Sequence, residues 1–273
     1  MTTENFASFP IRRQHWTLGG EPFELIWPAD MDALLDDPRT RERFREDEYM
    51  PYWATLWPSA ALLAEHVLAH CRPGAGRAID LGCGVGLVAI AAARAGWTVT
   101  AADYDADALK FSEENARLNG VTLAGTARVD WRTPFVGEPF DLVLASDVLF
   151  ERRHSGPVAR WIAAALAPDG LALVSDSNRG AAEGFPAIAA ATGLAVERLA
   201  CEQPGPHGLL IRGAVYRLLR PASLAAPYSS QHHCAPHRRR ELCRGPQHYR
   251  RSLPQLPRPG RSPIDAIVGG YAG

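Results

Sequence analysis

Residues 78–86 read AIDLGCGVG, and this stretch decides the fold of the chain. A short apolar run ends in Asp80, and glycines follow at every second position, as Gly82, Gly84 and Gly86. Glycine has no Cβ, so the backbone here can turn sharply and pass close to a ligand. We therefore interpret the stretch as the turn from a buried strand into a helix at a ligand site. A glycine-rich turn in an unrelated α/β protein is the alternative interpretation.

Strand and helix patterns alternate on the C-terminal side of this turn. Seven strands with interleaved helices predict an α/β fold, a doubly wound, Rossmann-like and mostly parallel sheet. No helical pattern separates the last two strands, so we expect them to form an antiparallel hairpin at one edge. The predicted strands are 78–81, 98–103, 127–130, 140–146, 171–176, 194–200 and 209–219, and the predicted helices are 87–95, 106–118, 158–166 and 181–191.

The segments on either side of this core have different compositions. Residues 12–27 alternate loosely around Gly19-Gly20, which predicts a β-hairpin, and residues 30–48 have a helical, charged pattern typical of a solvated face. The Pro- and Arg-rich tail has no sustained period, and its Cys and His residues match no standard zinc spacing, so we expect no metal site. The predicted parts are an N-terminal hairpin and helical extension (1–50), the main domain (51–220) and a basic, disordered tail (221–273).

Charge and hydropathy exclude several classes of protein. The tail carries eight arginines against Glu241 and Asp265, a net +6, so with −1 overall residues 1–220 carry −7. An acidic body argues against a broad nucleic-acid surface. No run of about 18 apolar residues exists and residues 1–13 lack a secretory pattern, so we expect a cytoplasmic protein without membrane contact. The single lysine, Lys110, does not lie in a Gly-Lys-Ser/Thr sequence, which excludes a P-loop.

The carboxylates near the glycine turn indicate the kind of ligand. Leu87 follows the last glycine, so the run misses the dinucleotide fingerprint by one position. A carboxylate at Asp80 would repel a pyrophosphate but suits an ammonium group. Asp103 ends the second strand seventeen residues after Gly86, where an acid can hold both ribose hydroxyls. Together these residues favour a zwitterionic, cationic ligand such as S-adenosylmethionine.

Two further carboxylate–aromatic pairs follow later strands. Asp130-Trp131 ends the third strand, where the carboxylate could accept a hydrogen bond from an adenine amine and the ring could stack on the base. A surface turn is the alternative. Residues 145–151 read ASDVLFE, so Asp147 follows a buried strand and Phe150 comes three residues later. Open α/β sheets bind ligands at this end of their strands, so both are candidate catalytic residues. Otherwise Asp147 caps the turn and Phe150 is core.

The motifs IDLGCGVG, AADYD, VDW and SDVLFE, in this order, resemble those of seven-strand S-adenosylmethionine-dependent methyltransferases. Asp147-Val148-Leu149-Phe150 resembles the (D/E)xx(Y/F) signature of the protein-lysine methyltransferases in that class. Residues 47–67, DEYMPYWATLWPSAALLAEHV, are similar to the segment that these enzymes carry just before their first core strand. In the electron transfer flavoprotein β-subunit lysine methyltransferase and its bacterial relatives a Trp-Pro pair opens the helix, as Trp57-Pro58 does here. The resemblance covers residues 20–220. It departs at residues 175–179, which read SDSNR instead of a Gly-Asp-Pro-Gly-Arg-like turn, and at Phe150, which offers no phenol.

The resemblance implies S-adenosylmethionine as the cofactor and a protein lysine as the methyl acceptor. The substrate could resemble the electron transfer flavoprotein β subunit. Trp57 is expected to cover the cofactor, whereas Trp53 is equally well explained as a core residue. Arg179 could meet an acidic substrate or cap a loop. His66, His70 and His154 show no metal-ligand pattern and are expected at the surface, and no metal is expected elsewhere.

A lysine acceptor would need alignment more than it would need a strong base. Neutralising an amine with a pKa near 10.4 costs about 4 kcal/mol at neutral pH, and positioning can supply roughly 7–11 kcal/mol. We hypothesise that Asp147 attracts the ammonium and then accepts a hydrogen bond from the neutral amine, while Phe150 lines its cationic or aliphatic part. A small amine or other metabolite is an alternative acceptor. A noncatalytic protein of the same fold is a third possibility, against which the intact glycine motif, Asp103 and Asp147 argue.

Overall fold

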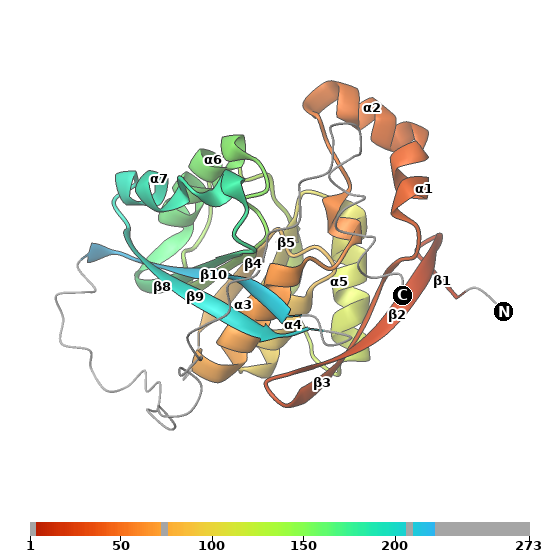
Figure 1. Ribbon diagram of the computed structural model, residues 1–273, viewed down its shortest axis with the longest axis horizontal. Helices are drawn as coiled ribbons and strands as arrows, with labels where there is room; N and C mark the ends of the chain where they lie inside the picture. Colours follow the sequence, from red (N-terminus) through yellow and green to blue (C-terminus); the bar gives the residue numbers. More distant parts are fainter. Residues whose placement is uncertain (1–3, 72–75, 206–209, 222–273) are drawn as a thin grey trace, which may run out of the picture. The chain divides into compact units, whose positions relative to one another are not determined.

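The main sheet has seven strands in the order β6-β5-β4-β7-β8-β10-β9 (Figure 1). The computed structural model describes residues 4–71, 76–205 and 210–221. The tail and its Cys and His residues therefore lie outside the described residues. The strands are β4 (Arg77–Leu81), β5 (Thr98–Asp103), β6 (Gly125–Arg128), β7 (Phe140–Ser146), β8 (Leu166–Asp176), β9 (Ala195–Pro204) and β10 (Leu210–Leu219).

The strand directions confirm the predicted fold class. β4 lies in the middle, with β5 and β6 on one side and β7 and β8 on the other, all parallel. β10 runs antiparallel between β8 and β9, so the last two strands form the expected hairpin at one edge. The chain therefore changes direction of winding beside β4, and ligands bind at the carboxyl ends of strands at such a point.

Helices cover both faces of the sheet because its central strands are apolar on both faces. Leu142 and Leu144 of β7 pack into one apolar cluster, and Val143 and Ala145 pack into another on the opposite face. The first cluster includes residues of α3 (Pro58–His70), α4 (Leu87–Arg94) and α5 (Ala106–Leu118); the second includes residues of α6 (Arg152–Ala165) and α7 (Phe185–Ala191).

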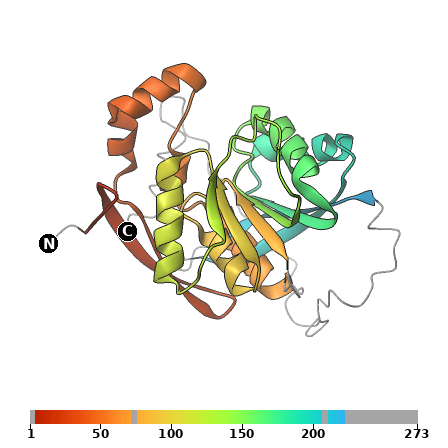
Figure 2. The same cartoon turned by 180° about the vertical axis from the view of Figure 1, so that it is seen from behind.

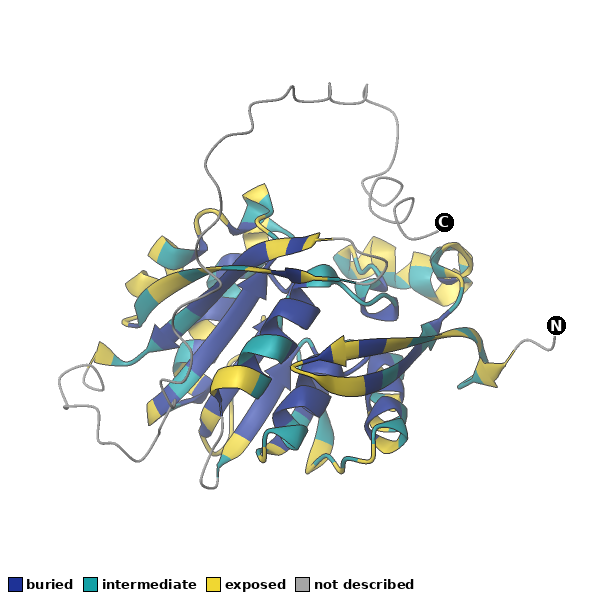
Figure 3. Cartoon of the chain, turned by 60° about the horizontal axis from the view of Figure 1, so that its bottom comes forward, coloured by how far each residue is buried: buried dark blue, intermediate teal, exposed yellow. Residues whose placement is uncertain are grey.

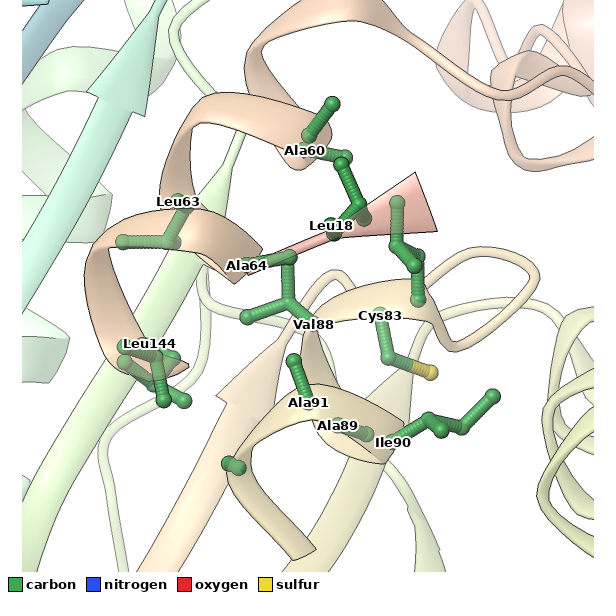
Figure 4. Packing of buried hydrophobic residues seen from close by; sticks show 14 of the residues in the cluster. Leu18, Ala60, Leu63, Ala64, Cys83, Val88, Ala89, Ile90, Ala91 and Leu144 are labelled. Carbon is green, nitrogen blue, oxygen red and sulfur yellow. The ribbon is translucent and has the colours of Figure 1, made fainter. Parts of the chain in front are cut away.

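Small residues allow α3 and α4 to approach each other and the sheet closely. Ala64 of α3 lies near Val88 of α4 (Figure 4), in an apolar cluster that also includes Ala60, Ala91 and Leu144. Alanine has high helix propensity and little side-chain entropy to lose on burial, so these segments form helices that pack densely. Figure 3 shows the central strands buried, whereas β9 and much of β2 consist mostly of exposed and partly buried residues.

The N-terminal segment forms its own three-stranded sheet of β1 (Asn5–Phe6), β2 (Phe9–Leu18) and β3 (Glu21–Pro28). Gly19 and Gly20 make the predicted hairpin turn with φ values of 58° and 82°, in the left-handed region that glycine tolerates. The hairpin lies along α5 (Figure 2). The buried Asn115 amide fixes it there, accepting from the Ile26 backbone N–H at 2.8 Å and donating to its carbonyl at 2.9 Å.

Two short helices, α1 (Met31–Asp36) and α2 (Pro38–Asp47), follow the hairpin. α2 has no buried residue, so polar contacts hold it in place. Arg43 Nη1 lies 2.7 Å from Asp105 Oδ2, and Asp47 Oδ2 lies 2.9 Å from the Tyr104 hydroxyl and 3.0 Å from Arg132 Nη2. The absence of buried residues in α2 agrees with the predicted solvated face, although some of its charged side chains also have partners within the protein. Its charged residues bind the loops after β5 and β6, at the carboxyl edge of the sheet.

Within the described part of the chain, no helix has both the length and the apolar character needed to cross a membrane.

Candidate active site at the carboxyl edge of the sheet

The loop between β4 and α4 is held in a defined shape by backbone hydrogen bonds. The N–H groups of Gly82 and Cys83 both donate to the Ala102 carbonyl on β5, at 2.8 and 2.9 Å. Gly82, Gly84 and Gly86 have φ values of 73°, 52° and 91°, all in the left-handed region. The glycines are therefore required by the backbone conformation itself.

The glycines differ in what surrounds them. A Cβ on Gly86 would lie 2.4 Å from Ser112 Oγ, so this glycine allows α4 to begin against α5. A Cβ on Gly82 would lie 2.8 Å from Val148 Cγ1 and 3.2 Å from the Trp131 ring. Only Gly84 has no such crowding, with the nearest atom at 3.5 Å. The sequence predicted that these glycines let the backbone pass close to a ligand, and Gly84 fits this prediction best. Gly82 and Gly86 are also needed for packing within the protein.

Asp80 is completely buried beneath this loop. Its Oδ2 accepts a hydrogen bond from the Ala89 backbone N–H at 3.0 Å, whereas Oδ1 has no partner among the described residues. Burial raises the pKa of Asp80 to about 7, and the charge of Asp103 adds to this rise. An ammonium at the loop would favour the charged carboxylate. Because the side chain is enclosed, Asp80 would act on such a ligand through its field or a bridging water.

Asp103 ends β5 at the edge of the same loop. Its carboxylate accepts from the backbone N–H groups of Gly84 and Asp105, both at 2.9 Å. Burial raises the pKa of Asp103 to about 6, although these two hydrogen bonds oppose the rise. A backbone hydrogen bond from Tyr104 also lowers the pKa, so of about four acceptor sites roughly one remains for a ligand hydroxyl. The position agrees with a role in holding a ribose.

Asp130 and Trp131 lie in different surroundings although they are adjacent. Trp131 packs against the glycine loop and lies 5.5 Å, centroid to centroid, from His154. Asp130 is ion-paired with Arg132, whose Nε lies 2.9 Å from both carboxylate oxygens. Arg132 also binds Asp47 of α2. Trp131 is therefore well placed to meet a base beside the loop, whereas Asp130 would have to share its carboxylate with Arg132.

Asp147 is buried and joins three segments of the chain. Its Oδ2 accepts from the backbone N–H of Ser59 at 3.0 Å and from the Ser59 hydroxyl at 2.5 Å. Its Oδ1 forms an ion pair with Arg179, and its own N–H donates to the Ser175 carbonyl at 3.0 Å. The residue has a left-handed φ of 55°. Sequence reasoning missed Ser59, because the two residues are 88 positions apart.

Aromatic rings line the space beside Asp147. Trp57 donates its indole N–H to the Tyr52 carbonyl at 2.7 Å, and Tyr52 belongs to the short helix η1 (Tyr52–Ala54). The Tyr52 ring lies 5.9 Å from the Trp57 ring and 4.8 Å from the Phe150 ring. The Arg179 guanidinium lies 5.3 Å from the Trp57 centroid. Arg179 thus links Trp57 to Asp147.

His154 extends this row of rings, 4.6 Å from Phe150, and connects it to Trp131. Only 15% of its side chain is exposed, so the expectation that it lies at the surface is wrong. Burial lowers the pKa of His154, which keeps the imidazole neutral at pH 7. Neither Tyr52 nor His154 was identified as a site residue from sequence. Their spacing, five residues before Trp57 and four after Phe150, was the available signal.

No group of three or more His, Cys, Asp or Glu side chains in residues 4–71, 76–205 and 210–221 is arranged to hold a metal ion. The glycine loop, the unpartnered Asp80 oxygen, the free acceptor site of Asp103 and the Trp131 ring form a set that suits a nucleoside bearing an ammonium. These residues fit S-adenosylmethionine, and none of them would ligate a metal.

Comparison with known proteins agrees with this geometry. A family model described as a methyltransferase domain matches residues 44–245. The ribosomal protein L11 methyltransferase of Bradyrhizobium diazoefficiens is 41% identical over 110 residues, covering 37% of this chain and 36% of that protein. The electron transfer flavoprotein β-subunit lysine methyltransferase of Danio rerio is 30% identical over 140 residues, covering 47% and 51%.

A ubiquinone biosynthesis O-methyltransferase from a Caulobacter species is 35% identical over 104 residues, covering 38% of this chain and 41% of that protein. The chain thus spans about half or less of the length of these relatives. A solved 16S rRNA methyltransferase from T. thermophilus, in complex with S-adenosylmethionine and guanosine, shares the fold with a TM-score of 0.52. It has 14% identity over 77% of this chain and 51% of that one.

The family model covers well over half of the chain, and the strand order and the glycine loop agree with it. The chain therefore belongs to the methyltransferase domain family.

Proposed function

We propose that the chain is an S-adenosylmethionine-dependent N-methyltransferase that methylates lysine side chains of a protein. The observation that carries the proposal is the contact between the Asp147–Phe150 motif and the cofactor loop. A Cβ on Gly82 would lie 2.8 Å from Val148 Cγ1, so the motif stands directly beside the glycine loop. Methyl transfer requires donor and acceptor to be held in line at close range. This adjacency supports the motif as the acceptor side of the site.

The cofactor, when bound, supplies a methyl group on a positively charged sulfur. Gly84 would let the backbone pass close to it, Asp103 would hold the ribose and Trp131 would contact the adenine. Trp57 and Phe150 would enclose the reacting end and exclude water. Exclusion of water strengthens each electrostatic contact inside the site.

Among the residues that the structure describes, the site contains no carboxylate or imidazole in an evident general-base arrangement, and the reaction does not need one. An amine with a pKa near 10.4 is neutralised at a cost of about 4 kcal/mol at neutral pH. Proximity and orientation can supply roughly 7–11 kcal/mol. Asp147, with its partners Ser59 and Arg179, keeps the acceptor side rigid. Because Asp147 Oδ1 also accepts from the Ser177 hydroxyl at 3.5 Å, the sequence-based hypothesis that Asp147 itself bonds the amine requires it to release one of these partners.

A protein acceptor is supported by two of the relatives, whose names give a lysine of the electron transfer flavoprotein β subunit and ribosomal protein L11 as targets. A partner similar to the β subunit is part of the proposal. A second candidate is a small-molecule acceptor, which the similarity to ubiquinone O-methyltransferases favours. The three relatives match over similar lengths, so the acceptor has to be decided by experiment.

The test is a transfer assay with methyl-labelled S-adenosylmethionine and an extract from cells whose own methylation has been blocked. The label is resolved by gel and by small-molecule chromatography. We expect a discrete labelled protein band. Label confined to the small-molecule fraction would move the assignment to a metabolite methyltransferase. Cofactor binding without transfer to either fraction would support a noncatalytic protein.

A further inference from the structure

The acceptor nitrogen needs a polar partner that fixes its lone pair, and Asp147 is poorly available for this. One of its oxygens accepts two hydrogen bonds from Ser59, and the other is paired with Arg179 and accepts from the Ser177 hydroxyl at 3.5 Å, so its roughly four acceptor sites are occupied. Breaking these contacts would leave the Ser59 N–H without a partner and the largely buried Arg179 guanidinium with only the more distant Asp176 carboxylate, 3.6 Å from Nε, at a cost of roughly 1–3 kcal/mol for each group. A polar group that makes no hydrogen bond within the protein is therefore a better candidate for the direct partner of the acceptor nitrogen.

Tyr52 is such a group, and its ring contacts Trp57 and Phe150, whose motif begins with Asp147. Its hydroxyl has no hydrogen-bond partner among the described residues, whereas the hydroxyls of Tyr49 and Tyr104 bind Asp105 and Asp47. The Tyr52 ring is partly buried between Phe150 and Trp57. Two ring contacts and the Trp57 indole bond to its carbonyl fix its orientation.

The charges around the Tyr52 hydroxyl define its state. Burial raises its pKa, and Glu151 adds to the rise, while the positive charges of Arg179 and Arg153 oppose it. The hydroxyl therefore stays protonated at neutral pH. It is close enough to feel the positive charge of Arg179, the residue that pairs with Asp147. A neutral phenol can donate one hydrogen bond and accept others, so its oxygen can accept from an N–H of an amine.

We propose that Tyr52 contacts the acceptor directly, its hydroxyl oxygen accepting a hydrogen bond from the acceptor N–H, while Asp147 positions Arg179 and the start of α3. This inference rests on the proposed function. The nitrogen lone pair forms the new N–C bond as the S–C bond breaks, and the resulting ammonium loses its proton to solvent. Tyr52 keeps its own proton throughout. The phenol that the Asp147–Phe150 motif lacks at Phe150 is thus supplied from η1.

Three substitutions separate the hydroxyl from its ring. Tyr52→Phe keeps the ring contacts and removes the hydroxyl, and Tyr52→Leu removes both. Tyr216→Phe removes a buried phenol on β10, away from the site, and serves as the control. The probes are methyl-labelled S-adenosylmethionine and the methylation-blocked extract, with transfer rate and cofactor affinity measured for each variant.

We expect Tyr52→Phe to slow transfer about tenfold, the effect of one lost hydrogen bond, with cofactor affinity unchanged. Tyr52→Leu should be slower still, and Tyr216→Phe should match the unaltered chain. Full transfer by Tyr52→Phe with loss only in Tyr52→Leu would overturn the inference, because the ring alone would matter. Equal weakening of cofactor binding in Tyr52→Phe would also overturn it.

The proposed function is tested separately, by the fraction that the unaltered chain labels. Label confined to small molecules would refute the lysine proposal. The variants would then be compared on that fraction, because the argument concerns the acceptor nitrogen whatever its size. Absence of transfer to either fraction would refute both.

Discussion

Replacing Gly86 with alanine tests how the glycine loop is built. Gly86 has a φ of 91°, a conformation that costs a residue with a Cβ roughly 1–2 kcal/mol. The new Cβ would also lie 2.4 Å from Ser112 Oγ and 2.9 Å from Ser112 Cα. Part of this clash is with backbone, so α4 and α5 must separate slightly, and overpacking of this kind costs about 1–3 kcal/mol. We expect Gly86→Ala to lower the free energy of unfolding by about 2–5 kcal/mol.

The assay is urea unfolding of Gly86→Ala and of the matched control Gly120→Ala. Gly120 also has a positive φ, 66°, but a Cβ there would meet nothing within 4 Å. The control should therefore lose only the conformational part, about 1–2 kcal/mol. The difference between the two variants measures the contact with Ser112. Equal destabilisation of the two variants would refute the packing role given to Gly86.

Three further predictions concern charge, a buried amide and the tail. Because burial raises the folded-state pKa of Asp80 to about 7 and of Asp103 to about 6, above the ordinary value of 3.8, the folded state binds more protons between pH 4 and 7. The free energy of unfolding should therefore fall as pH rises through that window, by about 4 kcal/mol for Asp80 alone. In urea titrations at several pH values, Asp80→Asn should show a smaller fall. A dependence of the unfolding free energy on pH that is unchanged in Asp80→Asn would contradict this. Asn115→Ala should cost about 2–4 kcal/mol in the same assay, because the Ile26 backbone groups lose their buried partner, and a loss under 1 kcal/mol would contradict it. A chain ending at Arg220 should keep its affinity for S-adenosylmethionine in calorimetry, and a large loss would place the tail in the working protein.

Local patterns in the sequence predicted the elements of the fold well. The strand at residues 140–146 and the helix at residues 106–118 have the bounds expected from their apolar runs and caps. The hairpin turn at Gly19-Gly20 also has the predicted place. These features depend on neighbours within a few residues, and hydrophobic periodicity records such relations directly.

The partners of the site residues could not be predicted in this way. Asp147 accepts hydrogen bonds from Ser59, which is 88 residues away in the sequence. Asp130 is paired with Arg132, which also forms an ion pair with Asp47 of α2. His154 is largely enclosed because α6 turns it toward Trp131, a contact that no period in the sequence encodes. Sequence patterns thus indicated which residues lie together at the carboxyl edge of the sheet. They did not indicate which of these side chains are already hydrogen-bonded or ion-paired within the protein.

The measurement that tests the central claim most directly is amino-acid analysis of the labelled acceptor. The protein band labelled by methyl-labelled S-adenosylmethionine is excised and hydrolysed, and the radioactive amino acid is identified by chromatography against standards. The account predicts that the label co-migrates with methylated lysine. Label on any other amino acid, or recovered only in a small molecule, would contradict a lysine methyltransferase.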